Sequence, residues 1–522
     1  MRTRFTGLIA LLLLFAGSAH AQEAAEAAMT VDERISNAVQ PFVTPIVSTV
    51  FYSVPILGVD FPLIVGWLIV AATIFTLYFG FIQFRGFAHS ISIVKGDYFD
   101  PKDAGEVTPF QALTTALSGT VGLGNIAGVG VAMYLGGPGA TFWMILAGLL
   151  GMASKFTECM LGVHYRNSYP DGTVSGGPMY YLSKGLSEQN RAGLGKFLAV
   201  FFSICCIGGA LGGGNMFQAN QAFAQFAGIF PSIADVGWIF GLVMAIIVGI
   251  VIIGGIKSIA RVTEKVVPGM AAIYVGAALI IILMNIDAVP AAFASIFQGA
   301  FTGEGVVGGA VGALIQGFRR AAFSNEAGIG SAAIAHSAVQ TQHPATEGYV
   351  ALREPFIDTV VICTMTALVI IITGVWTPDN GVSGIELTSA AFSNDLPFFR
   401  YVLALAAVLF AFSTMLSWSY YGMKAWTYLF GEGKVKEIVF KLIFLVFIVI
   451  GASMGLGPVI DFSDSMIFAM SLFNITGLYF LMPKVKELLN DYRGKIKSGE
   501  IKKVDERGES FRTAEENLPP GA

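Results

Sequence analysis

Long apolar runs follow one another along this chain, and each is about as long as the hydrocarbon core of a bilayer is thick. A helix needs roughly 20 apolar residues to cross that core, and runs of this length recur from residue 62 to residue 482. Hydrophobic residues make up 55% of the 522 residues and charged residues only 13%. One soluble core could not hide so much apolar surface. We therefore expect an all-α integral membrane protein.

The spacing of the runs predicts about eleven transmembrane helices. They are expected near residues 62–83, 110–133, 140–163, 197–227, 236–255, 267–286, 308–335, 355–376, 398–424, 437–455 and 460–482. Ahead of them, two arginines, a short apolar run and Ala19-His20-Ala21 have the order of a signal peptide. We predict cleavage after residue 21, with an uncleaved anchor as the alternative. Residues 22–61 would then be a periplasmic segment, and residues 62–83 an additional helix ahead of the core.

Basic residues mark every second loop between the predicted helices. These loops hold Arg85, Lys95 and Lys102; Arg166, Lys184, Arg191 and Lys196; Lys257, Arg261 and Lys265; Arg353; and Lys434 and Lys436. The opposite loops, after the first helix, hold no Lys or Arg. Because basic loops stay in the cytoplasm, we predict a multi-pass protein of the cell inner membrane. Its mature N-terminus would be periplasmic, and its basic tail, residues 483–522, cytoplasmic.

Composition and motifs exclude several function classes. A net charge of -4 argues against a nucleic-acid partner. The sequence contains no GxxxxGK[ST] motif, so it gives no sign of a nucleotide-binding site. Residues Gly122–Ala127 match the dinucleotide pattern G-x-G-x-x-A, but no strand precedes them. The four cysteines form no metal-binding motif, and no nucleophile and base stand out as in an enzyme. We predict no enzyme activity and no organic cofactor.

Two of the predicted helices are interrupted by small and polar residues. Ser118–Gly130 reads SGTVGLGNIAGVG, and Gly317–Gly330 reads GFRRAAFSNEAGIG. Glycines weaken a helix, and opened backbone is tolerated at membrane depth only where it lines a cavity or binds something. The first segment alone would equally suit tight helix packing through Gly-xxx-Gly spacings. The second interruption favours a binding site formed by two discontinuous helices.

The two discontinuous helices divide the core into halves of similar plan. Residues 108–286 and 308–482 each contain about five predicted spans and begin with the interrupted one. An odd number of spans gives the halves opposite orientations, so we predict an inverted repeat. Secondary transporters built in this way bind substrate and ion near the midplane, between unwound backbone and half-helix ends.

Four motifs, in a fixed order along the chain, resemble those of a known transporter family. They are GTVGLGNIAGV at 119–129, GGPGATFWM at 136–144, GMASKFTE at 151–158 and FSNEAG at 323–328. The chain resembles the alanine or glycine:cation symporter family over nearly all of its membrane core. That resemblance implies sodium-coupled uptake of small neutral amino acids, such as alanine and glycine, on the leucine-transporter-like inverted-repeat fold. A proton-coupled symporter and a membrane amino-acid sensor are the alternatives.

Sodium is a hard cation that prefers oxygen ligands, and the interrupted helices supply them. We predict a first sodium cluster at Thr120, Asn125 and Ser324. By analogy with the common sodium site of the fold, a second cluster would join backbone oxygens of the first gap to hydroxyls of the ninth span. Its residues are Ser118, Val121, Ser413 and Thr414. The alternative for each hydroxyl, including Ser417, is a bond to its own helix.

The amino-acid substrate needs donors for its carboxylate and a small pocket for its side chain. Half-helix N-termini favour anions, so we expect the carboxylate at Gly122 to Asn125, where glycines allow close approach. The predicted substrate contacts are Gly122, Gly124, Asn125, Gln218, Phe323, Ser324 and Trp418. For Gln218 the alternative is a cross-helix hydrogen bond, with Asn215 or Gln221 on the same face.

Intramembrane charges are costly and point to function by default. We expect Glu326 to form an ion pair with the adjacent Arg319 and Arg320, and Lys155 to pair with Glu158 three residues later. A titrating Glu326 would instead favour proton coupling.

Overall fold

The computed structural model describes residues 31–302, 308–377 and 381–504. The predicted signal peptide, residues 1–21, lies outside the described residues, as does the end of the predicted tail. The described chain is mostly helical, with two short antiparallel hairpins. These are β1 (Ser53–Ile56) with β2 (Val59–Pro62), in which Ser53 faces Pro62, and β3 (Asn167–Ser168) with β4 (Val174–Ser175), in which Asn167 faces Ser175.

Three kinds of helix make up the described chain. The α-helices are α2 (Val31–Val50), α3 (Leu63–Tyr78), α4 (Ile82–Arg85), α5 (Phe87–Val94), α6 (Pro109–Thr120), α7 (Val129–Gly136), α8 (Gly139–His164), α9 (Pro178–Glu188), α10 (Ala192–Leu211), α11 (Phe217–Ile229), α12 (Gly237–Ile252), α13 (Gly255–Met284), α14 (Val289–Thr302), α15 (Gly309–Asn325), α16 (Ala332–His336), α17 (Pro344–Ala351), α18 (Arg353–Pro355), α19 (Thr364–Ile372), α20 (Gly384–Asp395), α21 (Phe399–Phe430), α22 (Lys434–Ser453) and α23 (Leu456–Ser498). The π-helical segments are η1 (Gly124–Gly128), η2 (Gly212–Met216) and η5 (Phe356–Cys363), and the 3-10 turns are η3 (Pro231–Ile233) and η4 (Ile286–Ala288).

Six helical stretches of the described chain are long and apolar enough to cross a membrane. They are Gly139–His164, Ala192–Ile229, Gly255–Met284, Pro344–Ile372, Phe399–Phe430 and Leu456–Ser498. The bent pair α6 and η1–α7 makes a seventh, and α3 and α12 are shorter apolar helices. Of the other predicted spans, 308–335 is broken between α15 and α16, and 437–455 carries charged residues at its start. The protein is thus a multi-pass membrane protein, and the count of about eleven spans stays a prediction.

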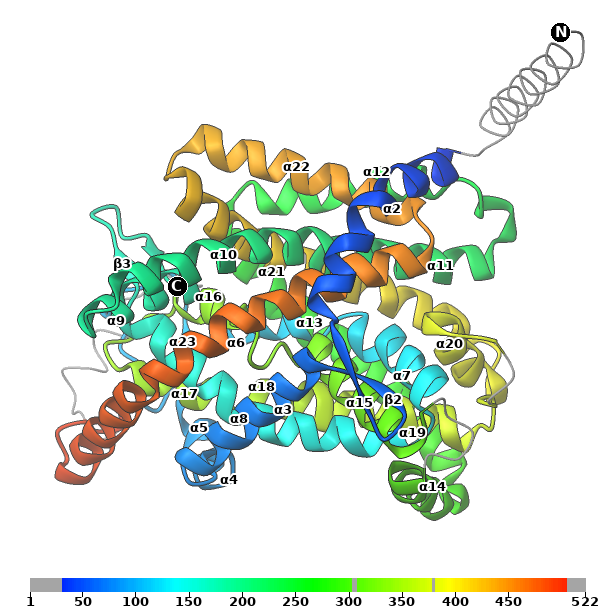
Figure 1. Ribbon diagram of the computed structural model, residues 1–522, viewed down its shortest axis with the longest axis horizontal. Coiled ribbons are helices and arrows are strands. Elements are labelled where there is room, and N and C mark those ends of the chain that lie inside the picture. The colour runs from blue at the N-terminus through cyan, green and yellow to red at the C-terminus, as the bar shows by residue number, and fades with distance from the viewer. Residues whose placement is uncertain (1–30, 303–307, 378–380, 505–522) are drawn as a thin grey trace, which may run out of the picture.

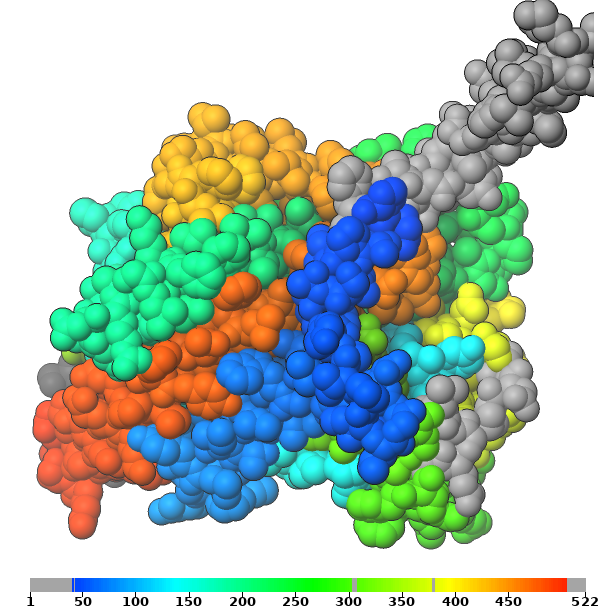
Figure 2. All heavy atoms as spheres, in the orientation of Figure 1, coloured from blue at the N-terminus to red at the C-terminus, as the bar shows by residue number. Residues whose placement is uncertain are grey.

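Helices α10 and α22 run along the long axis of the molecule, α23 runs obliquely to them, and α2 crosses α23 (Figure 1). Helix α9 and the β3 hairpin lie at one end, and α14 and α20 lie at the opposite end (Figure 1). Figure 2 shows the last part of α2 crossing over the C-terminal helix α23 on one face. There, the ring centroids of Phe51 and Phe468 are 5.4 Å apart. One large apolar cluster extends through the bundle and surrounds both discontinuous helices.

Both predicted interruptions are breaks in the structure. Helix α6 ends at Thr120, and the chain bends by 47° before continuing through η1 into α7. Helix α15 ends at Asn325, and α16 begins at Ala332. The breaks face each other, because a side chain added at Gly124 would lie 3.3 Å from the backbone of Ser324. The fold therefore brings the two gaps together in the buried centre.

Candidate functional site

The first gap consists of Val121, Gly122 and Leu123, where the regular helix stops. Side-chain oxygens from elsewhere satisfy two of its amides: the Gly122 N–H donates to Asn125 Oδ1 at 2.9 Å, and the Leu123 N–H donates to Gln218 Oε1 at 3.0 Å. An opened helix leaves such donors available for a ligand. The first gap thus presents two adjacent backbone N–H donors, which are bonded by the side-chain oxygens of Asn125 and Gln218.

Gly122 is required by close approach. A Cβ atom added there would lie 2.3 Å from Thr414 Oγ1 of α21 and 3.2 Å from Gln218 Oε1. Real Cβ atoms do not come so close to backbone or hydroxyl atoms, so any larger residue would push α21 away. Gly122, one of the predicted substrate contacts, is thus a position where α21 packs directly against the backbone of the first gap.

The second gap turns at a residue with left-handed backbone. Glu326 has φ +58°, which is uncommon for a residue with a side chain. Its carboxylate accepts hydrogen bonds from Trp418 Nε1 at 3.0 Å and from the Ser331 hydroxyl. The expected ion pair with Arg319 and Arg320 is wrong, because both guanidiniums pair with Asp464 of α23 instead.

The predicted first cluster gains a carboxylate that the sequence analysis missed. Asn125 Nδ2 donates to Asp358 Oδ1 at 2.6 Å, and Ser324 Oγ donates to the same oxygen at 3.1 Å. Asp358 is fully buried in η5. Thr120 does not reach this group, since its hydroxyl bonds the carbonyls of Ala116 and Leu117 in its own helix at 3.3 Å each. The signal for Asp358 was present: a lone acid near the start of an apolar span.

The predicted second cluster forms in part. Thr414 Oγ1 donates to the Ser118 carbonyl at 2.9 Å, and Val121 directly precedes the glycine that meets Thr414. Ser413 instead bonds the Phe410 carbonyl of its own helix at 3.0 Å. Ser417, for which such a bond was the alternative, donates across to Thr115 O at 2.7 Å. The first gap and α21 are therefore joined by hydroxyls, but through Thr414 and Ser417.

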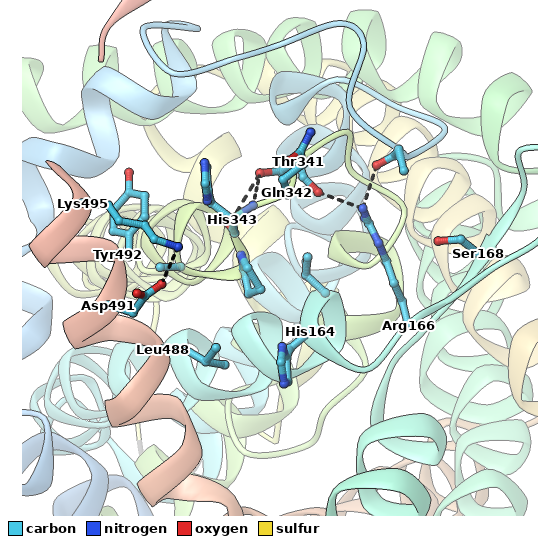
Figure 3. A pocket seen from close by; sticks show the side chains of 14 residues that line it. His164, Arg166, Ser168, Thr341, Gln342, His343, Leu488, Asp491, Tyr492 and Lys495 are labelled. Atoms are coloured by element: carbon cyan, nitrogen blue, oxygen red, sulfur yellow. Dashed lines mark hydrogen bonds and ion pairs between the residues drawn. The ribbon is translucent and has the colours of Figure 1, made fainter. Parts of the chain in front are cut away.

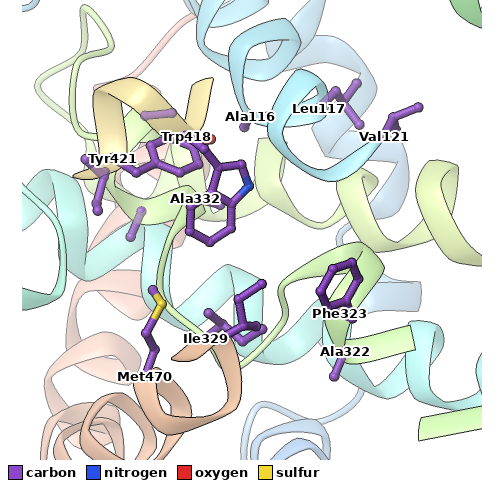
Figure 4. Packing of buried hydrophobic residues seen from close by; sticks show 14 of the residues in the cluster. Ala116, Leu117, Val121, Ala322, Phe323, Ile329, Ala332, Trp418, Tyr421 and Met470 are labelled. Carbon is purple, nitrogen blue, oxygen red and sulfur yellow. The ribbon is translucent and has the colours of Figure 1, made fainter. Parts of the chain in front are cut away.

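Aromatic side chains stand on either side of the second gap (Figure 4). Phe323 packs against Phe217 with ring centroids 5.1 Å apart. The Trp418 indole N–H reaches the Gly119 carbonyl at 3.3 Å as well as Glu326. A Cβ atom at Gly213 would lie 3.2 Å from the Phe323 ring, and one at Gly214 would lie 2.1 Å from Trp418. Both predicted aromatic residues therefore border the gaps, and each lies close against a glycine of η2.

Gln218 connects two glycine-rich segments. Besides accepting from Leu123, it donates from Nε2 to the Gly213 carbonyl at 2.8 Å. Its predicted neighbours point elsewhere: Asn215 donates to Phe444 O at 2.6 Å, and Gln221 accepts from the Ile385 N–H at 3.1 Å. Of the three amides, Gln218 alone bonds the first gap in the described structure.

The remaining buried charges form a separate group beside the site. Lys155 pairs with Glu354 at 3.1 Å, so the expected pair with Glu158 is wrong. Glu158 accepts from Asn474 at 2.7 Å. His336 lies between Glu354 and Glu347, with Nδ1 2.5 Å from Glu347. Such paired charges reduce the cost of burial and fasten α8, α16, α17 and α18 together.

Among the described residues, two of the cavities lie toward opposite ends of the molecule. One, of about 510 Å³, is lined by residues of α8, α23 and the segment between α16 and α17. The other, of about 460 Å³, is lined by residues of α11, α20 and the α22–α23 connection. Neither cavity is lined by a residue of the two clusters. Helix α20 covers the first discontinuous helix, since Thr388 Oγ1 donates to Ile126 O at 2.9 Å.

A comparison with solved structures finds a similar fold in a protein of the leucine-transporter fold. The crystal structure of MhsT in complex with L-phenylalanine superposes with a TM-score of 0.50 at 13% identity, and the match covers 74% of this chain and 98% of that one. At this identity the likeness concerns the fold alone.

Sequence comparison identifies close relatives. The sodium/alanine symporter AgcS of Methanococcus maripaludis is 40% identical over 412 residues, which cover 78% of this chain and 88% of that protein. The amino-acid carrier protein AlsT of Bacillus subtilis is 35% identical over 432 residues, covering 81% and 88%. The model of the sodium:alanine symporter family matches residues 44–506. With two discontinuous helices meeting at a glycine-walled, oxygen-rich centre, the chain belongs to the sodium:alanine symporter family, whose members are membrane transporters.

Proposed function

We propose that this protein is a symporter that carries a small neutral amino acid, alanine or glycine, into the cell together with sodium. The observation that carries the proposal is the pair of adjacent amides at Gly122 and Leu123. Side-chain oxygens of Asn125 and Gln218 hold them, and a carboxylate has two oxygens that suit the same donors. The substrate carboxylate would take their place.

Substrate size follows from the walls of the gaps. Gly122, Gly124 and Gly214 leave no room for a Cβ atom of their own without displacing Thr414, Ser324 or Trp418. A substrate side chain would lie beside Phe323 and Trp418, so alanine and glycine fit better than long side chains. Membership of a family named for alanine supports this assignment.

Sodium would bind where oxygen atoms converge. The first cluster would consist of Asn125, Ser324 and Asp358, and the second of the Ser118 and Val121 carbonyls with Thr414 and, after a rotamer change, Ser413. Oxygen ligands of this kind suit a hard cation. An ionised Asp358 would add a negative charge, and a bound cation would help its hydrogen-bond donors to compensate the burial of that charge.

A proton in place of sodium is the second candidate for coupling. Asp358 favours it, because a protonated carboxyl group could keep the bonds of Asn125 and Ser324 without any metal ion. The two candidates differ in what drives uptake, so one experiment separates them.

The proposed orientation places the N-terminus in the periplasm, the C-terminus in the cytoplasm and the protein in the inner membrane. The distribution of Lys and Arg among the loops supports it. The proposed inverted repeat gains support from α9 and α20. Each lies between the second and third spans of its half, and they lie at opposite ends of the molecule (Figure 1).

Uptake of labelled alanine into proteoliposomes tests the proposal. We expect an inward sodium gradient to drive uptake, while a potassium gradient of equal size does not. Uptake that follows a proton gradient and ignores sodium would favour the second candidate. Absence of uptake under both gradients would refute symport.

A further inference from the structure

Arg166, just beyond the end of α8, uses its guanidinium on main-chain carbonyls. Nη1 donates to Ser337 O at 2.9 Å and Val339 O at 2.5 Å, and Nη2 donates to Ala104 O at 2.6 Å and Thr341 O at 2.9 Å. Figure 3 shows Arg166 extending to the segment that carries Thr341 and Gln342. The four carbonyls belong to two stretches of chain, one before α6 and one between α16 and α17.

The same two stretches also bind each other through their backbones. The N–H groups of Glu106 and Val107 donate to Ala338 O at 2.8 and 3.2 Å, and the Gln340 N–H donates to Val107 O at 2.9 Å. Val107 and Val339 form a parallel β-bridge. We call the stretches 103–107 and 337–342, together with Arg166, the Arg166 junction.

Two further contacts make the junction tight. Gln342 Nε2 donates to Asp103 Oδ1 at 2.6 Å, and the Gln342 N–H donates to Asp103 Oδ2 at 3.2 Å. Gly105 has φ +151°, and a Cβ atom there would lie 2.3 Å from Val339 O. The two backbones touch at Gly105, and only glycine, which has no side chain, allows them to approach so closely.

The junction lies at the far ends of both half-helices that leave the site. Stretch 103–107 leads into α6, which a capping box at Thr108 begins and the first gap ends. Stretch 337–342 follows α16, which begins just after the second gap. Arg166 itself is continuous with α8. Three elements that border the gaps are therefore fastened at one point.

The contact between the Arg166 junction and α21 is weaker than the contacts within the junction, because it depends on one side chain of α21. Lys424 of α21 donates from Nζ to Val174 O at 3.0 Å and Ser175 Oγ at 2.8 Å, and Glu106 accepts from the Val174 N–H at 2.9 Å. Lys424 is buried, but these contacts depend on the ammonium group of one flexible side chain. Parting the junction would instead expose several backbone groups and a half-buried guanidinium at once.

We propose that Arg166 is a positioning residue of the transport cycle, which fastens α6, α8 and α16 so that they move as one body. Separation toward this end of the molecule then occurs along α21, at Lys424, and not across the junction. The inference rests on the proposed function, since it concerns how that site opens.

A reversible cross-link tests whether the junction opens. The variant Asp103→Cys with Gln342→Cys places two thiols where side chains already touch, while the four native cysteines are buried. We expect the oxidised protein to keep sodium-driven alanine uptake within about twofold of the reduced protein. If oxidation abolishes uptake and reduction restores it, the stretches must part in each cycle and the proposal is wrong.

The role of Arg166 is tested in the same assay. We expect Arg166→Gln to lower uptake about tenfold or more, because charge-assisted bonds to several carbonyls are lost. In a variant that combines Arg166→Gln with the cysteine pair, oxidation should restore most of the uptake, because the disulfide replaces the lost fastening. A local packing defect at Arg166 would not be repaired by the disulfide. Arg166→Lys should not restore it, since an ammonium group lacks the planar fork. No rescue by the cross-link would overturn the positioning role.

Two controls separate the possible failures. Arg261→Gln removes an exposed arginine that bonds only its own helix in the described structure, and it should leave uptake unchanged. The parent protein must show sodium-driven uptake. A parent without uptake refutes the proposed function, whereas an active parent that the cross-link blocks refutes the junction alone.

Discussion

Asp358 brings a carboxyl group to a centre whose gaps are otherwise lined by amides, hydroxyls and glycines, apart from the Glu326 carboxylate at the turn of the second gap. Its Oδ1 receives hydrogen bonds from both discontinuous helices, through Asn125 and Ser324, and its Oδ2 receives one from Thr359 at 2.6 Å. A buried carboxylate keeps its charge only when donors or a cation compensate the lost hydration. If the proposed sodium ion binds here, Asp358 would link the arrangement of both breaks to its presence.

Replacing Asp358 tests this residue-scale role. Asp358→Asn keeps the shape but removes the charge, so we expect the apparent sodium KM for alanine uptake to rise about tenfold or more. Asp235→Asn, at an exposed position, is the control and should leave the KM unchanged. An unchanged sodium KM in Asp358→Asn would remove Asp358 from the first cluster.

Gly122 offers a second test at this scale. Gly122→Ala would place a Cβ atom 2.3 Å from Thr414 Oγ1, so we expect loss of both alanine binding and sodium dependence. Gly228→Ala in α11, where nothing lies within 4 Å, should fold and transport normally, because alanine suits a helix better than glycine. Binding by Gly122→Ala equal to that of the parent would contradict the close approach.

The two helix breaks could be predicted from the sequence, but the partners of the buried charges could not. Both breaks were predictable, since glycines and polar residues interrupt apolar runs of membrane length. The partners of the charges were not: Arg319 and Arg320 pair with Asp464, far along the chain. Helical spacing favours near neighbours such as Lys155 and Glu158, and only packing decides that Glu354 is nearer. The same holds for Asp358, whose π-helical segment turns it toward Asn125.

The C-terminal helix α23 continues well past its apolar part and packs on α5 at its end. His89 Nε2 lies 2.9 Å from the Tyr492 hydroxyl, and Lys503 pairs with Asp97 at 3.1 Å. Burial, together with the charges of Lys503 and Arg493, lowers the pKa of His89 below its ordinary 6.5. The neutral ring is therefore the form that the packed end of α23 favours.

Acidification should loosen this contact. A folded-state pKa below the unfolded one means that the contact is fully stable above pH 6.5 and loses stability as the pH falls below that value. We expect hydrogen exchange of the amides in residues 495–504, corrected for intrinsic rate, to increase between pH 7.5 and 5.5. His89→Gln should show a flatter dependence. Equal pH dependence in both proteins would exclude His89 as the cause.

The two breaks meet in the buried interior of the molecule, and neither of the two end cavities is lined by a residue of the proposed sodium clusters. Sodium and substrate together would shift the balance between the two open states only through their differential affinity for them. One net charge entering across ~100 mV supplies about 2.3 kcal/mol, enough for roughly fifty-fold accumulation of a zwitterion. In the proposed symporter, binding of the two ligands is coupled, and this coupling is reciprocal by linkage.

The most direct measurement reverses the usual driving force. Proteoliposomes with equal sodium on both sides receive an inward alanine gradient, and the entry of labelled sodium is followed. We expect alanine to drive sodium inward, and we expect Asp358→Asn to reduce this flux much more than Asp235→Asn does. Entry of alanine with no accompanying sodium would contradict sodium-coupled symport.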